Sequence, residues 1–139
     1  MYTVLPDIRT MIEHKLTSNK AAKITGWVIT AIVALLFISS AFFKFFPNEQ
    51  GLAQVKAMGI ELSAFQFLGV IELITIALYV YPRTGVLGSL LLIAYLGGVM
   101  ATHLVVHQPL VIPIVLQVLV WISAAIRFPE LTARLRKVF

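Results

Sequence analysis

Four strongly polar side chains stand out within the apolar stretches of this sequence: Lys44, Glu72, His103 and Gln117. An ionised side chain at the middle of a membrane helix costs about 2.5–3.5 kcal/mol on insertion scales, so such a residue usually serves a function. A carboxyl group beside an amine or an imidazole can exchange protons with a bound ligand. Because each of the four lies in a different apolar stretch, we expect them to meet in one polar pocket.

The expected depth of these side chains supports a shared pocket. Glu72 lies about eight residues, or roughly 12 Å at 1.5 Å per residue, from the outer end of its stretch, and the other three also fall in the outer half. Lys44, Glu72 and His103 are the candidate catalytic residues. The candidate ligand-binding residues are Lys44, Glu72, Gln117 and Trp121, whose indole N–H needs an acceptor inside a membrane.

Each candidate also has a purely structural interpretation. Lys44 can extend its ammonium group to the outer headgroups. Glu72 can be an ion-pair partner with no chemistry, and His103 can be a hydrated residue at a helix end. Gln117 and Trp121 can be packing residues between helices.

The elements that would position these residues are membrane-spanning helices. The chain has 139 residues, of which 60% are hydrophobic and 12% charged, and its mean hydropathy is +0.95. A helix of about 18–20 apolar residues crosses a hydrocarbon core about 30 Å thick. The sequence therefore predicts an all-α bundle of four transmembrane helices forming a single integral membrane domain over residues 1–139, with spans at about 26–46, 64–81, 85–106 and 110–128.

Short amphipathic surface helices are expected at both termini and in the first outer loop, outside the four spans. Their apolar positions fall at helical spacing in the N-terminal segment 1–23, in the loop 48–63 and in the tail 129–139. These positions are Ile8, Met11, Ile12 and Leu16; Leu52, Val55 and Met58; and Leu131, Leu135 and Val138. An unstructured tail is the alternative for the N-terminal segment.

Basic residues predict the orientation. Nine of the eleven lysines and arginines fall on one side of a four-span topology, and only Lys44 and Lys56 fall on the other. The positive-inside rule then places both termini in the cytoplasm, with the chain in a cell (plasma) membrane. The net charge of +5 is explained by anionic lipid headgroups beside the spans, so no nucleic acid partner is expected.

The absence of cysteine excludes several kinds of redox chemistry for the chain itself. Thiolate catalysis, iron–sulfur clusters and covalently attached haem c all need cysteine. His103 and His107 can share a helical face, but His14 is expected on the other side of the membrane, so no haem or metal is expected. Quinone is compatible with the sequence because it needs no covalent attachment.

Several motifs together resemble the DoxX-like family of small four-helix membrane proteins. They cover roughly residues 25–128, and Phe42 stands where the family usually has a glycine about two positions before its lysine. The motifs lie at 40–45, 57–59, 69–73, 81–88 and 97–104. The resemblance implies a four-helix fold. It also implies similarity to membrane subunits of quinone-linked sulfur oxidation such as thiosulfate:quinone oxidoreductase, to proteins associated with thiol or oxidative-stress enzymes, and to assembly factors.

Three functions are compatible with these features. The first is a quinone-linked redox membrane subunit that works with another membrane or peripheral redox protein. The second is a non-enzymatic scaffold or assembly factor for a partner membrane protein, with homo-oligomerisation also compatible. The third is a small carrier or proton-coupled channel. The sequence leaves open whether the chain is an enzyme.

Overall fold

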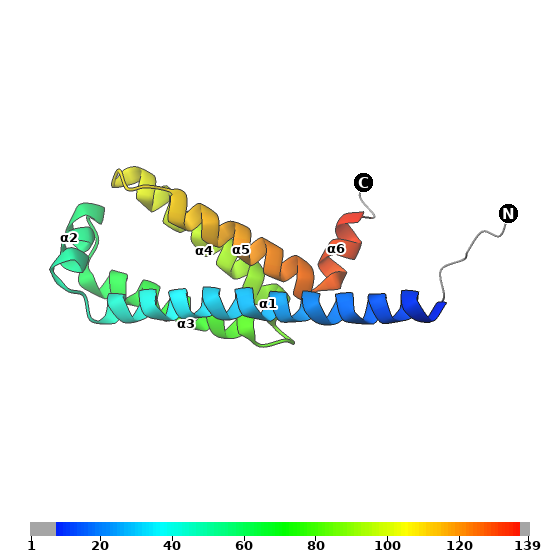
Figure 1. Ribbon diagram of the computed structural model, residues 1–139. Coiled ribbons are helices and arrows are strands. Elements are labelled where there is room, and N and C mark those ends of the chain that lie inside the picture. The colour runs from blue at the N-terminus through cyan, green and yellow to red at the C-terminus, as the bar shows by residue number, and fades with distance from the viewer. Residues whose placement is uncertain (1–7, 137–139) are drawn as a thin grey trace.

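The computed structural model describes the backbone of residues 8–136 and the side chains of residues 19–133. Every regular element in this part of the chain is a helix. The helices are α1 (Ile8–Phe45), α2 (Glu49–Met58), α3 (Leu62–Val80), α4 (Gly85–Val105), α5 (Val111–Arg127) and α6 (Pro129–Arg136) (Figure 1). The prediction of an all-α, four-helix membrane bundle is confirmed.

Three of the described helices have the length and composition of membrane spans, and a fourth is apolar but shorter. Residues 19–45 of α1, all of α3 and all of α4 are long and apolar enough to cross a bilayer. The shorter apolar helix α5 has 17 residues, which corresponds to a rise of about 26 Å. Large hydrophobic side chains are exposed on the outer surfaces of these helices, among them Leu35, Phe67 and Val111. Such surfaces are suited to contact with lipid chains.

The order of the helices around the bundle follows from their contacts. Helix α1 packs against α3 and α5, and α4 packs against the same two helices, so α1 and α4 lie diagonally opposite. The α4–α5 hairpin lies close to α1 and α3 at one end and diverges from them toward the end that carries α2 (Figure 1). We call these two ends the α2 end and the opposite end.

The N-terminal segment differs from the expectation. A separate surface helix was expected before a span starting near residue 26, but α1 runs without interruption over 38 residues from Ile8 to Phe45. The junction Ala21-Ala22-Lys23 contains good helix formers and no proline. Gly26 is retained within the helix, where an added Cβ would come to 3.0 Å from Ile126 of α5. The side chains of residues 1–18 and 134–139, including the apolar positions expected there, lie outside the described residues.

Helix α2 forms the short helix expected in the loop 48–63, and a cap residue marks each of its ends. The Asn48 side chain accepts a hydrogen bond from the Gly51 amide at 3.0 Å, and Gly59 adopts a left-handed conformation with φ of 65° at the end. These are the usual signals for a helix start and stop. Gly51 lies against the end of α1, because a Cβ at that position would be 2.8 Å from Pro47. Helix α2 is thereby held over the α2 end of the bundle.

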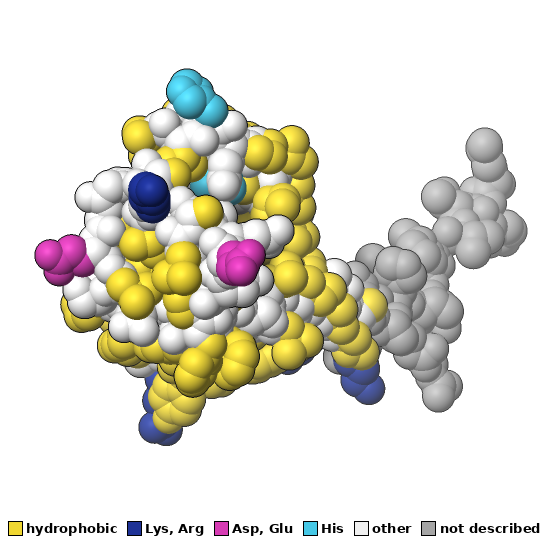
Figure 2. Space-filling model, turned by 90° about the vertical axis from the view of Figure 1, so that its left-hand side faces the viewer, with side chains coloured by type: hydrophobic (Ala, Val, Ile, Leu, Met, Phe, Trp, Pro, Cys, Tyr) yellow, Lys and Arg dark blue, Asp and Glu magenta, His cyan; other side chains and the backbone are white. Residues whose placement is uncertain are grey.

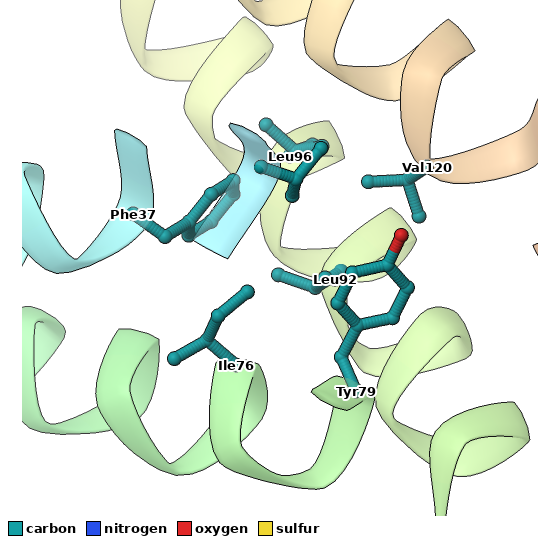
Figure 3. Packing of buried hydrophobic residues seen from close by; sticks show 7 residues of the cluster. Phe37, Ile76, Tyr79, Leu92, Leu96 and Val120 are labelled. Carbon is teal, nitrogen blue, oxygen red and sulfur yellow. The ribbon is translucent and has the colours of Figure 1, made fainter. Parts of the chain in front are cut away.

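A continuous apolar cluster fills the middle of the bundle (Figure 3). It takes Val33 and Phe37 from α1, Ile76 and Tyr79 from α3, Leu92 and Leu96 from α4, and Val120 from α5. The Tyr79 hydroxyl points toward α5, where it shares a hydrogen bond with the Ser123 hydroxyl. At Gly88, α4 comes so close to α3 that a Cβ would overlap the backbone of Tyr79.

Candidate functional site

Lys44 and Glu72 form a buried ion pair between α1 and α3. Lys44 lies in the last turn of α1, and its Nζ is 2.9 Å from Glu72 Oε1. The side chains are 12% and 3% exposed, respectively. A carboxylate in the middle of an apolar helix needs partners from other helices because the lipid offers none. The structure supplies one of them from α1.

Two hydroxyl groups complete the polar network around Glu72. Its Oε1 accepts hydrogen bonds from Ser40 Oγ at 3.1 Å and from Tyr95 Oη at 2.8 Å, in addition to Lys44 Nζ. Lys44 also donates to Ser40 Oγ at 2.7 Å. Residues from α1, α3 and α4 therefore converge on a single carboxylate oxygen.

The second oxygen of the same carboxyl group has a very different environment from the first. Glu72 Oε2 is buried and has no hydrogen-bond partner among the described residues. Leaving a buried acceptor unpaired costs about 1–3 kcal/mol, and more for a charged group. Such atoms are uncommon in native proteins and call for an explanation, such as a ligand that completes the site.

The network lies on the wall of a large cavity at the α2 end. Its volume is about 1050 Å³, and residues of α1 through α5 line it. Most of the lining is hydrophobic, and aromatic side chains contribute to the wall, including Phe37 and Phe65. Neutral polar residues also line the cavity: Gln50, Gln54, Thr102 and Gln108. A mostly apolar cavity of this size with a few convergent polar groups is typical of a small-molecule site.

The surface at the α2 end is only sparsely charged. Figure 2 views the molecule from this end and shows isolated acidic and basic side chains among hydrophobic and neutral polar atoms. Two histidine side chains are visible, one at the tip and one lying deeper. Both belong to the region around the α4–α5 turn, since His103 and His107 are the histidines with described side chains.

His103 lines the cavity but does not touch the ion pair. Its Nδ1 lies 2.9 Å from the Pro109 carbonyl oxygen, and because a carbonyl only accepts, Nδ1 must carry the proton. In a neutral ring Nε2 is then the acceptor. His103 is eight residues after Tyr95 on α4, which corresponds to about 12 Å along the helix axis. It is therefore placed farther toward the end of the bundle than Glu72.

The remaining two candidates on α5 are placed differently. Trp121 is 48% exposed on the outer surface of α5 and does not line the cavity. Gln117 is also absent from the lining, and its Oε1 is buried without a partner among the described residues. The inward positions of α5 are Pro113, Val120, Ser123 and Ala124. Trp121 is one residue from that stripe, about 100° around the helix, and so faces outward.

Sequence reasoning missed Tyr95. Its phenol lies in the apolar run of α4 and was not treated as polar, although a buried tyrosine hydroxyl needs a partner. That requirement is the signal that would have identified it. Ser40 was not among the candidate residues either, although its hydroxyl joins the network.

Arg127 organises a second polar cluster at the opposite end of the bundle. It donates from Nη1 to Thr30 Oγ1 at 3.0 Å and the Tyr79 carbonyl at 3.1 Å, and from Nη2 to the Val80 carbonyl at 3.1 Å. Its guanidinium also lies 4.4 Å from the centre of the Trp27 ring. Sequence reasoning treated this arginine only as a cytoplasmic charge.

The Arg127 contacts complete the end of α3. The last four carbonyl groups of a helix lack partners within it. In α3 these belong to residues 77–80: the first accepts from the Tyr81 amide, the second from Thr84 Oγ1, and the last two from Arg127. The cluster thus ties α1, α3 and α5 together, and its role is structural.

Comparison with known proteins agrees with this architecture. The family model described as the DoxX-like family matches residues 28–125, a range that contains the whole Glu72 network. No curated protein and no solved structure matches the chain significantly. The family match covers well over half of the sequence. The chain therefore belongs to the DoxX-like family and is an integral, multi-pass membrane protein.

Proposed function

We propose that this protein is a membrane subunit of a quinone-linked redox system and binds a neutral quinone ring in the cavity at the α2 end. The observation that carries the proposal is the Lys44–Glu72–Tyr95 network on the wall of a mostly apolar cavity of about 1050 Å³. Apolar walls suit a ring that arrives from the lipid. The polar network on one part of the wall can hydrogen-bond to the oxygen atoms of that ring.

The donors and acceptors of the network fit such a ligand. A lysine ammonium group has three N–H donors, and Lys44 uses two of them for Ser40 and Glu72. The third can hold a ring carbonyl oxygen. Glu72 Oε2 is an acceptor that the protein leaves unpaired. The cavity therefore offers both a donor and an acceptor at the same place.

The proposed chemistry assigns a distinct task to each side chain. When bound, a quinone supplies two-electron, two-proton redox chemistry. Lys44 would orient a ring oxygen and stabilise negative charge on it, and Glu72 would hold or release a proton at Oε2. His103 Nε2 would exchange protons nearer the end of the bundle. Because the chain has no cysteine to hold a redox centre, electrons would come from a substrate or from a partner redox protein.

The position of the cavity favours a ligand site over a transmembrane pathway. Phe37 and Leu96 line the cavity and also belong to the apolar cluster in the middle of the bundle (Figure 3). That cluster closes the cavity toward the opposite end and leaves no continuous row of polar side chains among the described residues. A carrier or channel would need such a row, and a scaffold would need no cavity.

The proposed orientation places this site on the outer side of a cell membrane. Most lysines and arginines lie on the side of the termini, which the positive-inside rule assigns to the cytoplasm. The α2 end, which carries the cavity, then faces outward. An electron donor or partner protein would approach from the outer aqueous phase.

A thermal-stability measurement tests the proposal. We expect decylubiquinone to raise the Tm of the purified chain in detergent micelles, because a ligand that binds only the folded state stabilises it. The double variant Lys44→Met/Glu72→Leu should lose this shift, since it removes the polar groups together and leaves no unpaired charge. Lys56→Met, an equivalent change at an exposed lysine of α2, should keep it. A wild-type Tm that responds to neither decylubiquinone nor its reduced form, decylubiquinol, would refute the proposal.

A further inference from the structure

We infer that the cavity prefers the reduced, hydroxyl-bearing form of its quinone ligand to the oxidised, carbonyl-bearing form. The inference rests on the proposed function and specifies which redox form the site is built to hold. It follows from the unequal treatment of the two oxygens of Glu72: three donors converge on Oε1 and none reaches Oε2.

While Glu72 is ionised in its ion pair with Lys44, the partner that Oε2 lacks must be a donor. A carboxylate oxygen can only accept hydrogen bonds, and the described protein groups offer Oε2 nothing. The donors close to the carboxyl group, namely Ser40, Lys44 and Tyr95, are all directed at Oε1. A ligand hydroxyl is a neutral donor that an apolar cavity can admit.

The carboxyl group can present Oε2 to the cavity without moving α3. Glu72 lines the cavity, although Oε2 itself is shielded from water. The terminal torsion of glutamate is broad and roughly two-fold, so a modest rotation redirects Oε2 without moving the backbone, provided that Oε1 stays within reach of its three donors. A ligand hydroxyl beside Glu72 could then complete the carboxylate.

The two redox forms of the ligand differ in the group that they bring to Oε2. Reduced quinone has hydroxyl groups, whereas the oxidised form has carbonyl oxygens, which would face another acceptor. A hydrogen bond to a charged group contributes more to binding than one between neutral groups. We therefore expect the reduced form to bind at least about tenfold more tightly, a ratio equivalent to about 1.4 kcal/mol.

Replacing the carboxylate by an amide should reverse the preference. In Glu72→Gln, the three donors select the amide oxygen for the position of Oε1, which leaves the NH₂ group at the position of Oε2. An NH₂ group donates and would pair with a carbonyl oxygen. The oxidised form should then bind more tightly than the reduced form.

The test compares dissociation constants for decylubiquinone and decylubiquinol, measured anaerobically with the full chain in the same detergent micelles. Wild type, Glu72→Gln and Glu61→Gln are compared. Glu61 is exposed at the α2 end, so its change to glutamine is the matched control and should keep the wild-type preference for the reduced form. Binding is read from the ligand concentration dependence of Tm, without any activity assay.

Each outcome decides the inference. Tighter binding of decylubiquinol to wild type, together with reversal in Glu72→Gln, supports it. Equal binding of the two forms to wild type, tighter binding of decylubiquinone to wild type, or an unchanged preference for decylubiquinol in Glu72→Gln overturns it and leaves the proposed quinone site standing. Binding of neither form to wild type overturns both proposals. The wild-type comparison does not depend on the folding of any variant.

Discussion

Glu72 accepts hydrogen bonds from side chains of α1 and α4. Its ion-pair partner Lys44 lies in α1, 28 positions earlier in the sequence. Taking both charges out of water is expensive, and their attraction repays this only when the geometry is good. Hydrophobic residues of similar size often replace such a pair without loss of stability. The presence of a buried charge pair at this position therefore favours a functional role over a purely structural one.

The pair should respond to single and double substitution in different ways. Lys44→Met alone or Glu72→Leu alone should cost about 3–5 kcal/mol of unfolding free energy, because each leaves an uncompensated buried charge. The double variant should recover most of that loss. Unfolding in mixed micelles with increasing sodium dodecyl sulfate measures all three. Losses that simply add in the double variant would show that the two residues do not interact.

The polar residues that form the ion pair could be predicted from the sequence better than the direction in which each side chain faces. Lys44 and Glu72 stand out in the sequence because a charge within an apolar run is costly whatever the fold. The outward position of Trp121 could not be found in this way, because neighbouring helical residues differ by about 100° and the rotation of α5 is set by packing. Tyr95 has a sequence signal, but a weak one, since a tyrosine near a membrane can also be an ordinary interface residue.

At the scale of helices, close approach of α3 and α4 depends on one glycine. A Cβ at Gly88 would overlap the backbone of Tyr79, whereas a Cβ at Gly97 on the same helix would meet nothing within 4 Å. Backbone atoms cannot move aside as a flexible side chain can. The position of α4 against α3 therefore requires glycine at 88 and not at 97.

The two glycines make a matched pair for substitution. Gly88→Ala should destabilise the protein by about 2 kcal/mol or more, because α4 must move away from α3. Gly97→Ala should be neutral or stabilising by up to about 1 kcal/mol, since alanine favours a helix more than glycine does. Denaturant midpoints of the two variants in micelles give the comparison. Equal effects would contradict the described α3–α4 contact.

Arg127 provides a second test at this scale. Arg127→Met should cost at least about 3 kcal/mol, because it removes three hydrogen bonds donated by a charged group, two of them to the last carbonyls of α3. Arg83→Met, an exposed arginine in the turn after α3, is the control and should leave the unfolding midpoint unchanged. If both substitutions had the same effect, Arg127 would act only as a surface charge.

The helices could be predicted from sequence largely because each has a local cause. The apolar runs predict the spans, and Asn48 and Gly59 mark the ends of α2. The continuity of α1 could not be predicted, because the change from polar to apolar residues suggested a boundary that the backbone does not make. The residues change from polar to apolar near residue 24, but the junction contains good helix formers and no proline.

For the molecule as a whole, the proposed orientation can be tested with single cysteines, because the natural chain has none. Lys56→Cys in α2 and Arg83→Cys in the turn between α3 and α4 are both at exposed positions. We expect a membrane-impermeant maleimide to label Lys56→Cys in intact cells and Arg83→Cys only after the cells are opened. The opposite labelling pattern would invert the orientation and place the cavity on the cytoplasmic side.

The most direct test of the quinone site is an experimental structure of the chain reconstituted in lipid with decylubiquinone. The expected result is a ring within hydrogen-bond distance of Lys44 Nζ and the Glu72 carboxyl group in the wild type, and no such ring in Lys44→Met/Glu72→Leu. A cavity that holds only acyl chains, or a Glu72 side chain that faces lipid, would contradict the proposal.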